Sequence, residues 1–147
     1  MLAERTDLPD VVKAAQRMLA EIQLAVRQFP RMHRYDIGAR LLDSAEQICV
    51  QLLQSWHQRH RRLTVAQAAS DELDQLKVRI QLGHDVQAWR SYAQAQHVYR
   101  LATEVGQQCG GWLLELRNKG QNAPASRRTQ RAPTLSSPVA SPAGANL

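Results

Sequence analysis

The sequence predicts an all-α protein, an antiparallel up-down-up-down four-helix bundle that is followed by a disordered basic C-terminal tail. The first 116 residues are rich in alanine, leucine, glutamine, arginine and glutamate and poor in β-branched residues, which is a helix-forming composition. Apolar residues recur three and four positions apart in four segments. Only short connections join these segments, and short connections make neighbouring helices antiparallel. We expect residues 1–120 to form the bundle and residues 121–147 to form the tail.

The first predicted helix begins near Asp7 and Pro9, because proline is tolerated in the first turn of a helix, and it ends before Pro30. A basic loop with the sequence FPRMHRYD follows. Asp36 is expected to cap the second helix, which ends in the basic segment HQRHRR beside the negative end of its dipole. The inner faces of these two helices are predicted to be Val11, Ala15, Met18, Ile22, Ala25 and Phe29, and Ile37, Leu41, Ala45, Ile48, Leu52 and Trp56.

The third and fourth predicted helices each begin at a possible capping box, in which a hydroxyl and a glutamine three residues later satisfy free backbone N–H groups. The boxes are Thr64-x-x-Gln67 and Ser91-x-x-Gln94. The predicted inner faces are Ala69, Leu73, Leu76 and Ile80 for the third helix, and Ala95, Val98, Ala102, Val105, Cys109, Trp112 and Leu116 for the fourth.

The net charge of +6 is unevenly distributed along the chain. Residues 1–116 hold 14 Lys/Arg against 13 Asp/Glu, whereas residues 117–147 hold five cations and no acidic residue. From Gln121 onward the chain is rich in alanine, proline, serine, threonine and arginine without an apolar period, which predicts disorder. An acid-free basic tail favours a polyanionic partner.

Several classes of protein are disfavoured by the sequence. No run of about 18 apolar residues is present and the N-terminus is acidic, so we expect a cytoplasmic protein that has no membrane partner. No phosphate-binding glycine loop or metal-ligand set is found, and we expect neither catalysis nor a cofactor or metal. Cys49 and Cys109 are expected to be reduced residues in or near the core. His84 and Asp85 could form a tautomer-fixing pair, but a polar contact at a helix end is favoured.

Basic residues are the best candidates for function. Arginine supplies 16 of the 19 cations, and its guanidinium suits bidentate contact with phosphates and stacking on bases. Cations gather in the first loop and at the second helix connection, which lie at opposite ends of an antiparallel bundle. The alternative is an ordinary solvated surface on which the arginines pair with Asp and Glu. The candidate nucleic-acid contacts are Arg31, Arg34, Arg59, Arg61, Arg62, Arg117, Lys119, Arg127 and Arg128.

Glycines interrupt the fourth helix, although each glycine inside a helix costs about 1 kcal/mol relative to alanine. Gly106 and Gly110 are four residues apart and therefore share a face. One interpretation is that a large side chain of a neighbouring helix in the same bundle needs room there. The other is that a helix of another subunit approaches this face, and the candidate oligomer interface is then Tyr99, Gly106, Gly110 and Leu113.

Three segments together resemble the accessory variability determinant (Avd) proteins of diversity-generating retroelements. They are FPRMHRYDIGARLLDSAEQI (29–48), LDQLKVRIQLGHDV (73–86) and YRLATEVGQQCGGWL (99–113), in this order. Avd proteins belong to a larger group of four-helix bundles that includes proteins encoded by intervening sequences of large-subunit rRNA genes. The resemblance covers about residues 10–120.

The resemblance implies a non-catalytic, ring-shaped homopentamer that binds the reverse transcriptase of the element and its template RNA, or an RNA/DNA hybrid. Gln81 departs from the arginine expected in many relatives, and the long tail exceeds the usual end of the family. The alternative function is a structural bundle that assembles with protein partners only, as an rRNA-intervening-sequence-like or phage protein. The positions that match the family pattern are Pro30, Arg31, Arg34, Leu82, Asp85, Gly110, Gly111 and Trp112.

Overall fold

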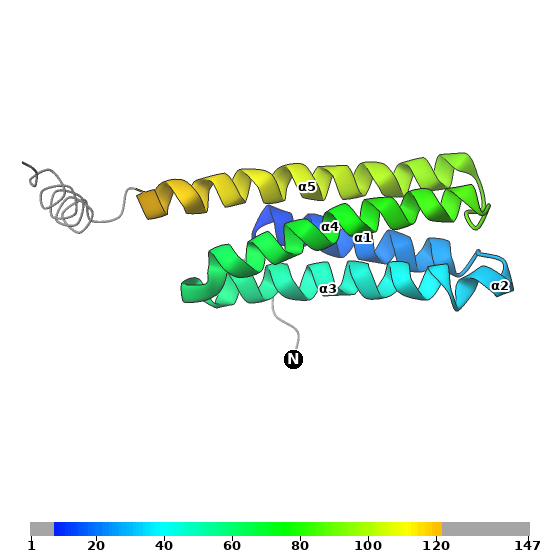
Figure 1. The fold of residues 1–147 in the computed structure, drawn as a ribbon, viewed down its shortest axis with the longest axis horizontal. Coiled ribbons are helices and arrows are strands. Elements are labelled where there is room, and N and C mark those ends of the chain that lie inside the picture. Colours follow the sequence, from blue (N-terminus) through cyan, green and yellow to red (C-terminus); the bar gives the residue numbers. More distant parts are fainter. Residues whose placement is uncertain (1–7, 122–147) are drawn as a thin grey trace, which may run out of the picture. The chain divides into compact units, whose positions relative to one another are not determined.

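The computed structural model describes residues 8–121, and within this range every regular element is a helix. Four long helices account for most of it, as the sequence predicts (Figure 1). The contacts divide the chain into two units, Met1–Leu116 and Arg117–Leu147, and the fold described below is that of the first. Asp7 and residues 122–147 of the predicted tail (121–147) lie outside the described residues, whereas Gln121 is the last residue of a helix. The long helices are α1 (Asp10–Val26), α3 (Ile37–His57), α4 (Arg62–Asp85) and α5 (Tyr92–Gln121).

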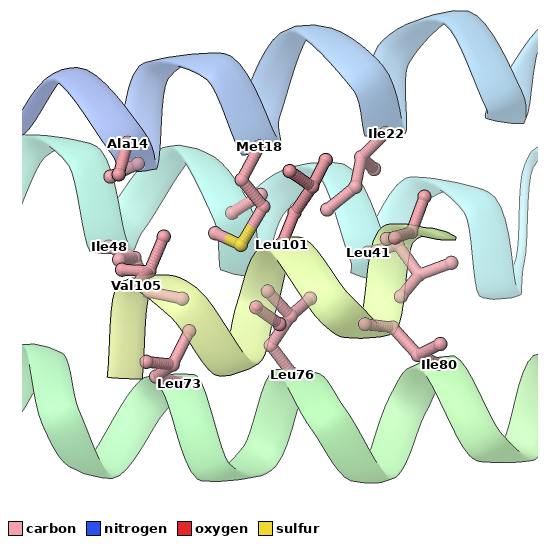
Figure 2. Close-up of a cluster of buried hydrophobic side chains, with 14 of the residues drawn as sticks. Ala14, Met18, Ile22, Leu41, Ile48, Leu73, Leu76, Ile80, Leu101 and Val105 are labelled. Atoms are coloured by element: carbon pink, nitrogen blue, oxygen red, sulfur yellow. The ribbon is translucent and has the colours of Figure 1, made fainter. Parts of the chain in front are cut away.

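The core lies where the apolar spacing predicts it. Nearly all residues of the four predicted inner faces are buried, and only Ile37, Trp56, Trp112 and Leu116 are half-buried. Figure 2 shows side chains from α1, α3, α4 and α5 converging on one interior. The removal of these side chains from water is the main stabilising contribution to such a fold.

Two short helices replace predicted loop or terminal segments. The basic segment after α1 contains α2 (Arg31–Arg34) rather than an irregular loop. The middle of the HQRHRR segment forms the 3-10 helix η2 (Arg59–Arg61), with α3 ending at His57 before it and α4 beginning at Arg62 after it. Both segments still connect the long helices at the two ends of the bundle (Figure 1).

The predicted caps have different outcomes. The cap at Ser91 is confirmed, because Ser91 Oγ accepts a hydrogen bond from the Gln94 N–H at 3.1 Å. The return bond of the predicted box is shifted by one residue, since Gln94 Oε1 accepts from the Arg90 N–H at 3.1 Å and not from that of Ser91. The box at Thr64 is wrong, since α4 begins two residues earlier and Thr64 lies inside it. Asp36 precedes α3, but its side chain makes no capping hydrogen bond, and its carboxylate lies 4.0 Å from Arg40 Nε.

The turn between α4 and α5 is a Schellman motif, in which two N–H groups after the helix bond back to its last carbonyls. The Gln87 N–H donates to the His84 carbonyl at 3.0 Å, and the Ala88 N–H donates to the Gly83 carbonyl at 2.8 Å. Gln87 occupies the position that favours glycine, with a φ of 61°. A side chain there is strained, since L-residues other than glycine avoid the left-handed region.

Trp89 follows this turn and is buried against the end of α4. Its indole N–H donates to the Ile80 carbonyl at 3.0 Å, and the ring centroid lies 5.0 Å from that of Phe29 in an edge-to-face arrangement. A Cβ on Gly83 would lie 2.8 Å from Trp89 Nε1, so only glycine leaves room for the indole. Trp89 therefore joins the α4–α5 turn to the end of α1. We call this the Trp89 end of the bundle, and the opposite end the η2 end.

Replacing Gln87 with glycine should raise the free energy of unfolding by about 1 kcal/mol, because it removes the left-handed strain at the Schellman position. Urea denaturation followed by circular dichroism measures the change. Gln87→Ala keeps the Cβ and is the matched control, with a stability close to that of the parent protein. A glycine variant no more stable than the alanine variant would contradict the assignment of strain to this position.

Candidate nucleic-acid interface

The nine predicted nucleic-acid contacts separate into three groups in the structure. Arg31, Arg59, Arg61, Arg117 and Lys119 are exposed. Arg34 and Arg62 are half-buried and bond to backbone carbonyls. Arg127 and Arg128 lie outside the described residues.

Arg62 closes the end of α3. Its Nε donates to the Ser55 carbonyl at 2.8 Å and its Nη2 donates to the Trp56 carbonyl at 2.6 Å. The guanidinium carbon also lies 5.2 Å from the centroid of the Trp56 ring and 6.0 Å from that of Trp112. The last carbonyls of a helix lack partners within it and carry partial negative charge, so a cation there is stabilising. Arg62 therefore caps a helix, whereas its neighbours Arg59 and Arg61 extend into solvent.

Arg34 likewise bonds to backbone carbonyls where α1 ends. Its Nη2 lies 3.2 Å from the Arg27 carbonyl and 3.3 Å from the Phe29 carbonyl. These carbonyls belong to the chain that leaves α1, and the guanidinium fixes the path of this segment. Two of the predicted phosphate contacts are therefore engaged with the backbone of their own chain.

Several exposed arginines at the ends of the bundle have no carboxylate partner within residues 8–121, whereas two arginines on its sides are paired. Side pairs are Arg17 with Glu104 at 3.7 Å and Arg79 with Glu72 at 2.9 Å. Arg100, on the side of α5, is exposed and has no ion pair among the described residues, so the alternative of a paired, solvated surface describes the sides only in part. Among the described residues no carboxylate pairs with the exposed arginines of the ends, which are Arg27, Arg31 and Arg90 at the Trp89 end and Arg59 and Arg61 at the η2 end.

Sequence reasoning did not select Arg27 or Arg90. Arg27 is the residue that directly follows α1, and Arg90 lies in the turn before α5. Their relation to Arg31 depends on the packing of Trp89 against Phe29, which brings the two connections together. The only sequence feature that could have pointed to these two arginines is that each lies next to a helix boundary.

The candidate oligomer interface does not form a single outward face. Leu113 is only 5% exposed and belongs to the core, because it lies beside Gly110 on the helix surface but on the side that faces the bundle. A Cβ on Gly106 would lie 3.2 Å from Leu73 Cδ2 and 3.3 Å from Lys77 Nζ, which agrees with the same-bundle interpretation. Gly110 has no atom within 4 Å of its Cβ position, and Tyr99 is partly exposed.

An apolar surface on α4 was missed in the sequence. Val78, Leu82 and Val86 are exposed and follow one another at four-residue spacing. Leu82 and Val86 line a groove of about 320 Å³ beside Ile37, with Asp36 and Asp85 on its margin. The signal was a second apolar row beside the buried row of Leu73, Leu76 and Ile80. Exposed apolar rows of this kind are typical of protein interfaces.

The cysteine thiols are poorly suited to nucleophilic chemistry. Burial raises the pKa of both Cys49 and Cys109 to about 11, and the nearby Glu46 carboxylate contributes to the rise at Cys49. The thiolate is the reactive form of cysteine, and at neutral pH both side chains remain thiols. Cys109 Sγ lies 3.8 Å from the Ala66 carbonyl, within the packing of α4 against α5.

Neither a metal-ligand cluster nor a membrane-spanning helix is found within the described residues. Within residues 8–121 no three His, Cys, Asp or Glu side chains gather closely enough to hold a metal ion. The same residues contain no helix with the length and apolar content needed to cross a bilayer. His84, whose role was open, makes a ring contact with Tyr92 at a centroid distance of 5.3 Å.

The fold and these surfaces define a helical protein with arginine-rich ends and an exposed apolar row on one helix. Comparison with protein-family models and with curated proteins gave no match to this chain.

The capping role of Arg62 is tested by stability. Arg62→Ala should lower the free energy of unfolding by about 2 kcal/mol, since it removes charge-assisted hydrogen bonds to half-buried carbonyls. Chemical denaturation measures the loss. Arg61→Ala removes a neighbouring exposed arginine and should change stability by less than about 0.5 kcal/mol. Equal effects of the two substitutions would contradict the cap.

Proposed function

We propose that the protein is a non-catalytic accessory factor of a diversity-generating retroelement, as Avd proteins are. It binds template RNA, or an RNA/DNA hybrid, together with the reverse transcriptase and supports mutagenic copying. The observation that carries the nucleic-acid part is the group of exposed arginines at both ends without carboxylate partners in the described part of the chain, whereas Arg17 and Arg79 on the sides are paired. The resemblance of residues 29–48, 73–86 and 99–113 supplies the family.

The proposal includes an up-down-up-down antiparallel bundle. Several contacts support it, because rising residue numbers in one helix meet falling numbers in its neighbour. Arg17 and Glu21 of α1 lie near Glu104 and His97 of α5, respectively. The same order holds for α3 and α4, where Ser55 bonds to Arg62 and Ser44 to Glu72, and for α4 and α5, where Ala66 meets Cys109 and Leu73 meets Gly106.

Arginine contacts with phosphates account for the expected mode of RNA binding. Each phosphate that is neutralised releases condensed counterions, so the affinity falls steeply with salt and depends little on sequence. Arg27, Arg31 and Arg90 provide these contacts at the Trp89 end, and Arg59 and Arg61 provide them at the η2 end. Arg34 and Arg62 support this surface indirectly by fixing the backbone beside it.

Protein partners are assigned to the remaining surfaces. The exposed row of Val78, Leu82 and Val86 offers apolar contact to the reverse transcriptase or to a second copy of the chain. Assembly into a homopentamer is part of the proposal, and Gly110 offers an unobstructed helix face for it.

A structural protein that assembles with protein partners only is the second candidate. The apolar row on α4 favours it, since that row fits an interface without nucleic acid. The two functions differ in whether the exposed arginines bind RNA, and the first experiment below separates them.

Two double variants test the ends independently. Arg31→Glu with Arg90→Glu, and Arg59→Glu with Arg61→Glu, should each weaken binding to structured RNA by about tenfold or more and make its dependence on log salt shallower by about 2. Fluorescence anisotropy across a salt series measures both quantities.

The control for these variants is Lys13→Glu with Arg17→Glu, which alters the net charge equally on the side of α1, where Arg17 is already paired. This control should retain most of the affinity and the slope. If the end variants and the control have the same slope, the end arginines are not the RNA interface and the structural function gains support.

The assembly is tested at Gly110. Because no atom lies within 4 Å of its Cβ position, Gly110→Leu should leave the helical content and melting temperature nearly unchanged while dissociating the oligomer. Sedimentation velocity measures the mass. Gly106→Leu is the contrasting variant and should destabilise the fold itself, because Leu73 and Lys77 occupy the space. A Gly110→Leu protein that stays assembled would place the interface elsewhere.

A further inference from the structure

A shallow groove of about 310 Å³ runs between α4 and α5. Side chains of both helices line it, including Gln81 and His84 from α4 and Tyr92, Gln96 and Tyr99 from α5. We call it the tyrosine groove. The arginine and apolar surfaces described above do not include it.

The walls of the tyrosine groove are aromatic and its base is apolar. Tyr92 is 63% exposed and Tyr99 is 38% exposed, and they lie seven residues apart on one face of α5. His84 packs against Tyr92 with the ring planes at 62°. Ile80 and Ala95, both nearly fully buried, line the same groove. Exposed aromatic rings above an apolar base form a surface on which a planar ligand can stack.

The polar groups of the groove are two neutral amides. Gln81 and Gln96 are exposed and, within the described part of the chain, neither side chain has a hydrogen-bond partner. Each amide offers both donors and an acceptor. No carboxylate lines the groove, since Asp85 lines the separate groove on the α3 side of α4. This combination suits a neutral planar ring with polar edges.

Cations flank the groove along its length. Arg90 is exposed and lies two residues before Tyr92. On α4, Lys77 precedes Gln81 by four residues and therefore shares its face, and its Nζ lies over Gly106 of α5. A chain of phosphates that follows the groove meets a cation before and after the aromatic rings. Basic tracks interrupted by aromatic rings are typical of sites for single-stranded nucleic acid.

We propose that the tyrosine groove binds an unpaired nucleobase of RNA. The base stacks on Tyr92 and Tyr99, and the Gln81 and Gln96 amides hydrogen-bond its edge. This inference rests on the proposed function, because the base belongs to the RNA held by the arginines of the Trp89 end. It adds to that function a contact with bases, and this contact favours single-stranded RNA over duplex RNA.

The experiment uses the full chain and a single-stranded RNA of about 12 nucleotides that carries one 2-aminopurine, a fluorescent base quenched by stacking. The wild-type protein should change its fluorescence on binding. Tyr92→Ala and Tyr99→Ala should each abolish or halve this change and weaken binding by about fivefold or more, the usual effect of losing a stacked base. Tyr92→Phe and Tyr99→Phe keep the rings and should restore both readouts.

The matched control is Tyr35→Ala, which removes an exposed tyrosine outside the groove and should behave like the wild type. Circular dichroism and sedimentation of each variant report the fold and the assembly. Alanine variants that keep the fluorescence change and the affinity would overturn the proposal, as would alanine variants that lose assembly but still bind RNA like the wild type. The latter result would identify the groove as a protein interface.

A duplex RNA of the same length separates the two proposals. If duplex binds in an arginine-dependent way and the tyrosine variants have no effect on single strands, only the base site is wrong. If the wild-type protein binds neither RNA at low salt, the proposed function is wrong and the base site with it.

Discussion

The arrangement of one whole end of the bundle depends on the hydrogen bond from the Trp89 indole N–H to the Ile80 carbonyl. An indole buried without a partner for its N–H would be destabilising by a few kcal/mol, so the ring can enter the core only where a carbonyl is available. Gly83 leaves room for the indole, and the left-handed turn at Gln87 directs the chain so that Trp89 faces the core. With the ring in place, Phe29 packs against it and the exit from α1 is joined to the α4–α5 turn.

The same constraint, that carbonyls at helix ends need partners, also shapes the arginine-rich ends. Arg34 and Arg62 satisfy carbonyls where α1 and α3 end, whereas the arginines next to them in sequence extend into solvent. Two populations of arginine thus occupy each connection. One holds the backbone in place, and the other is available to a partner. This division explains why a basic cluster read from a sequence overstates the number of contacts it can make.

The sequence predicts those features of the fold that follow from the helical spacing of apolar residues. Burial of Met18, Ile48 and Leu76 follows from spacing alone, because a helix that hides one row of apolar residues must hide its neighbours three and four positions away. The cap at Ser91 is local and was also predictable. The roles of Arg62 and Gly106 were not, since each depends on which atom of another helix stands opposite. The tyrosine groove likewise exists only once α4 and α5 have a relative register.

The length of α4 has a consequence for any ligand that touches both arginine clusters. The helix has 24 residues and spans roughly 36 Å at 1.5 Å per residue. A polyanion shorter than this distance can engage one end only, whereas a longer one reaches the second end as an intramolecular event with a high effective concentration. Under the proposed function, length rather than sequence is therefore the property of an RNA that the bundle would distinguish most strongly.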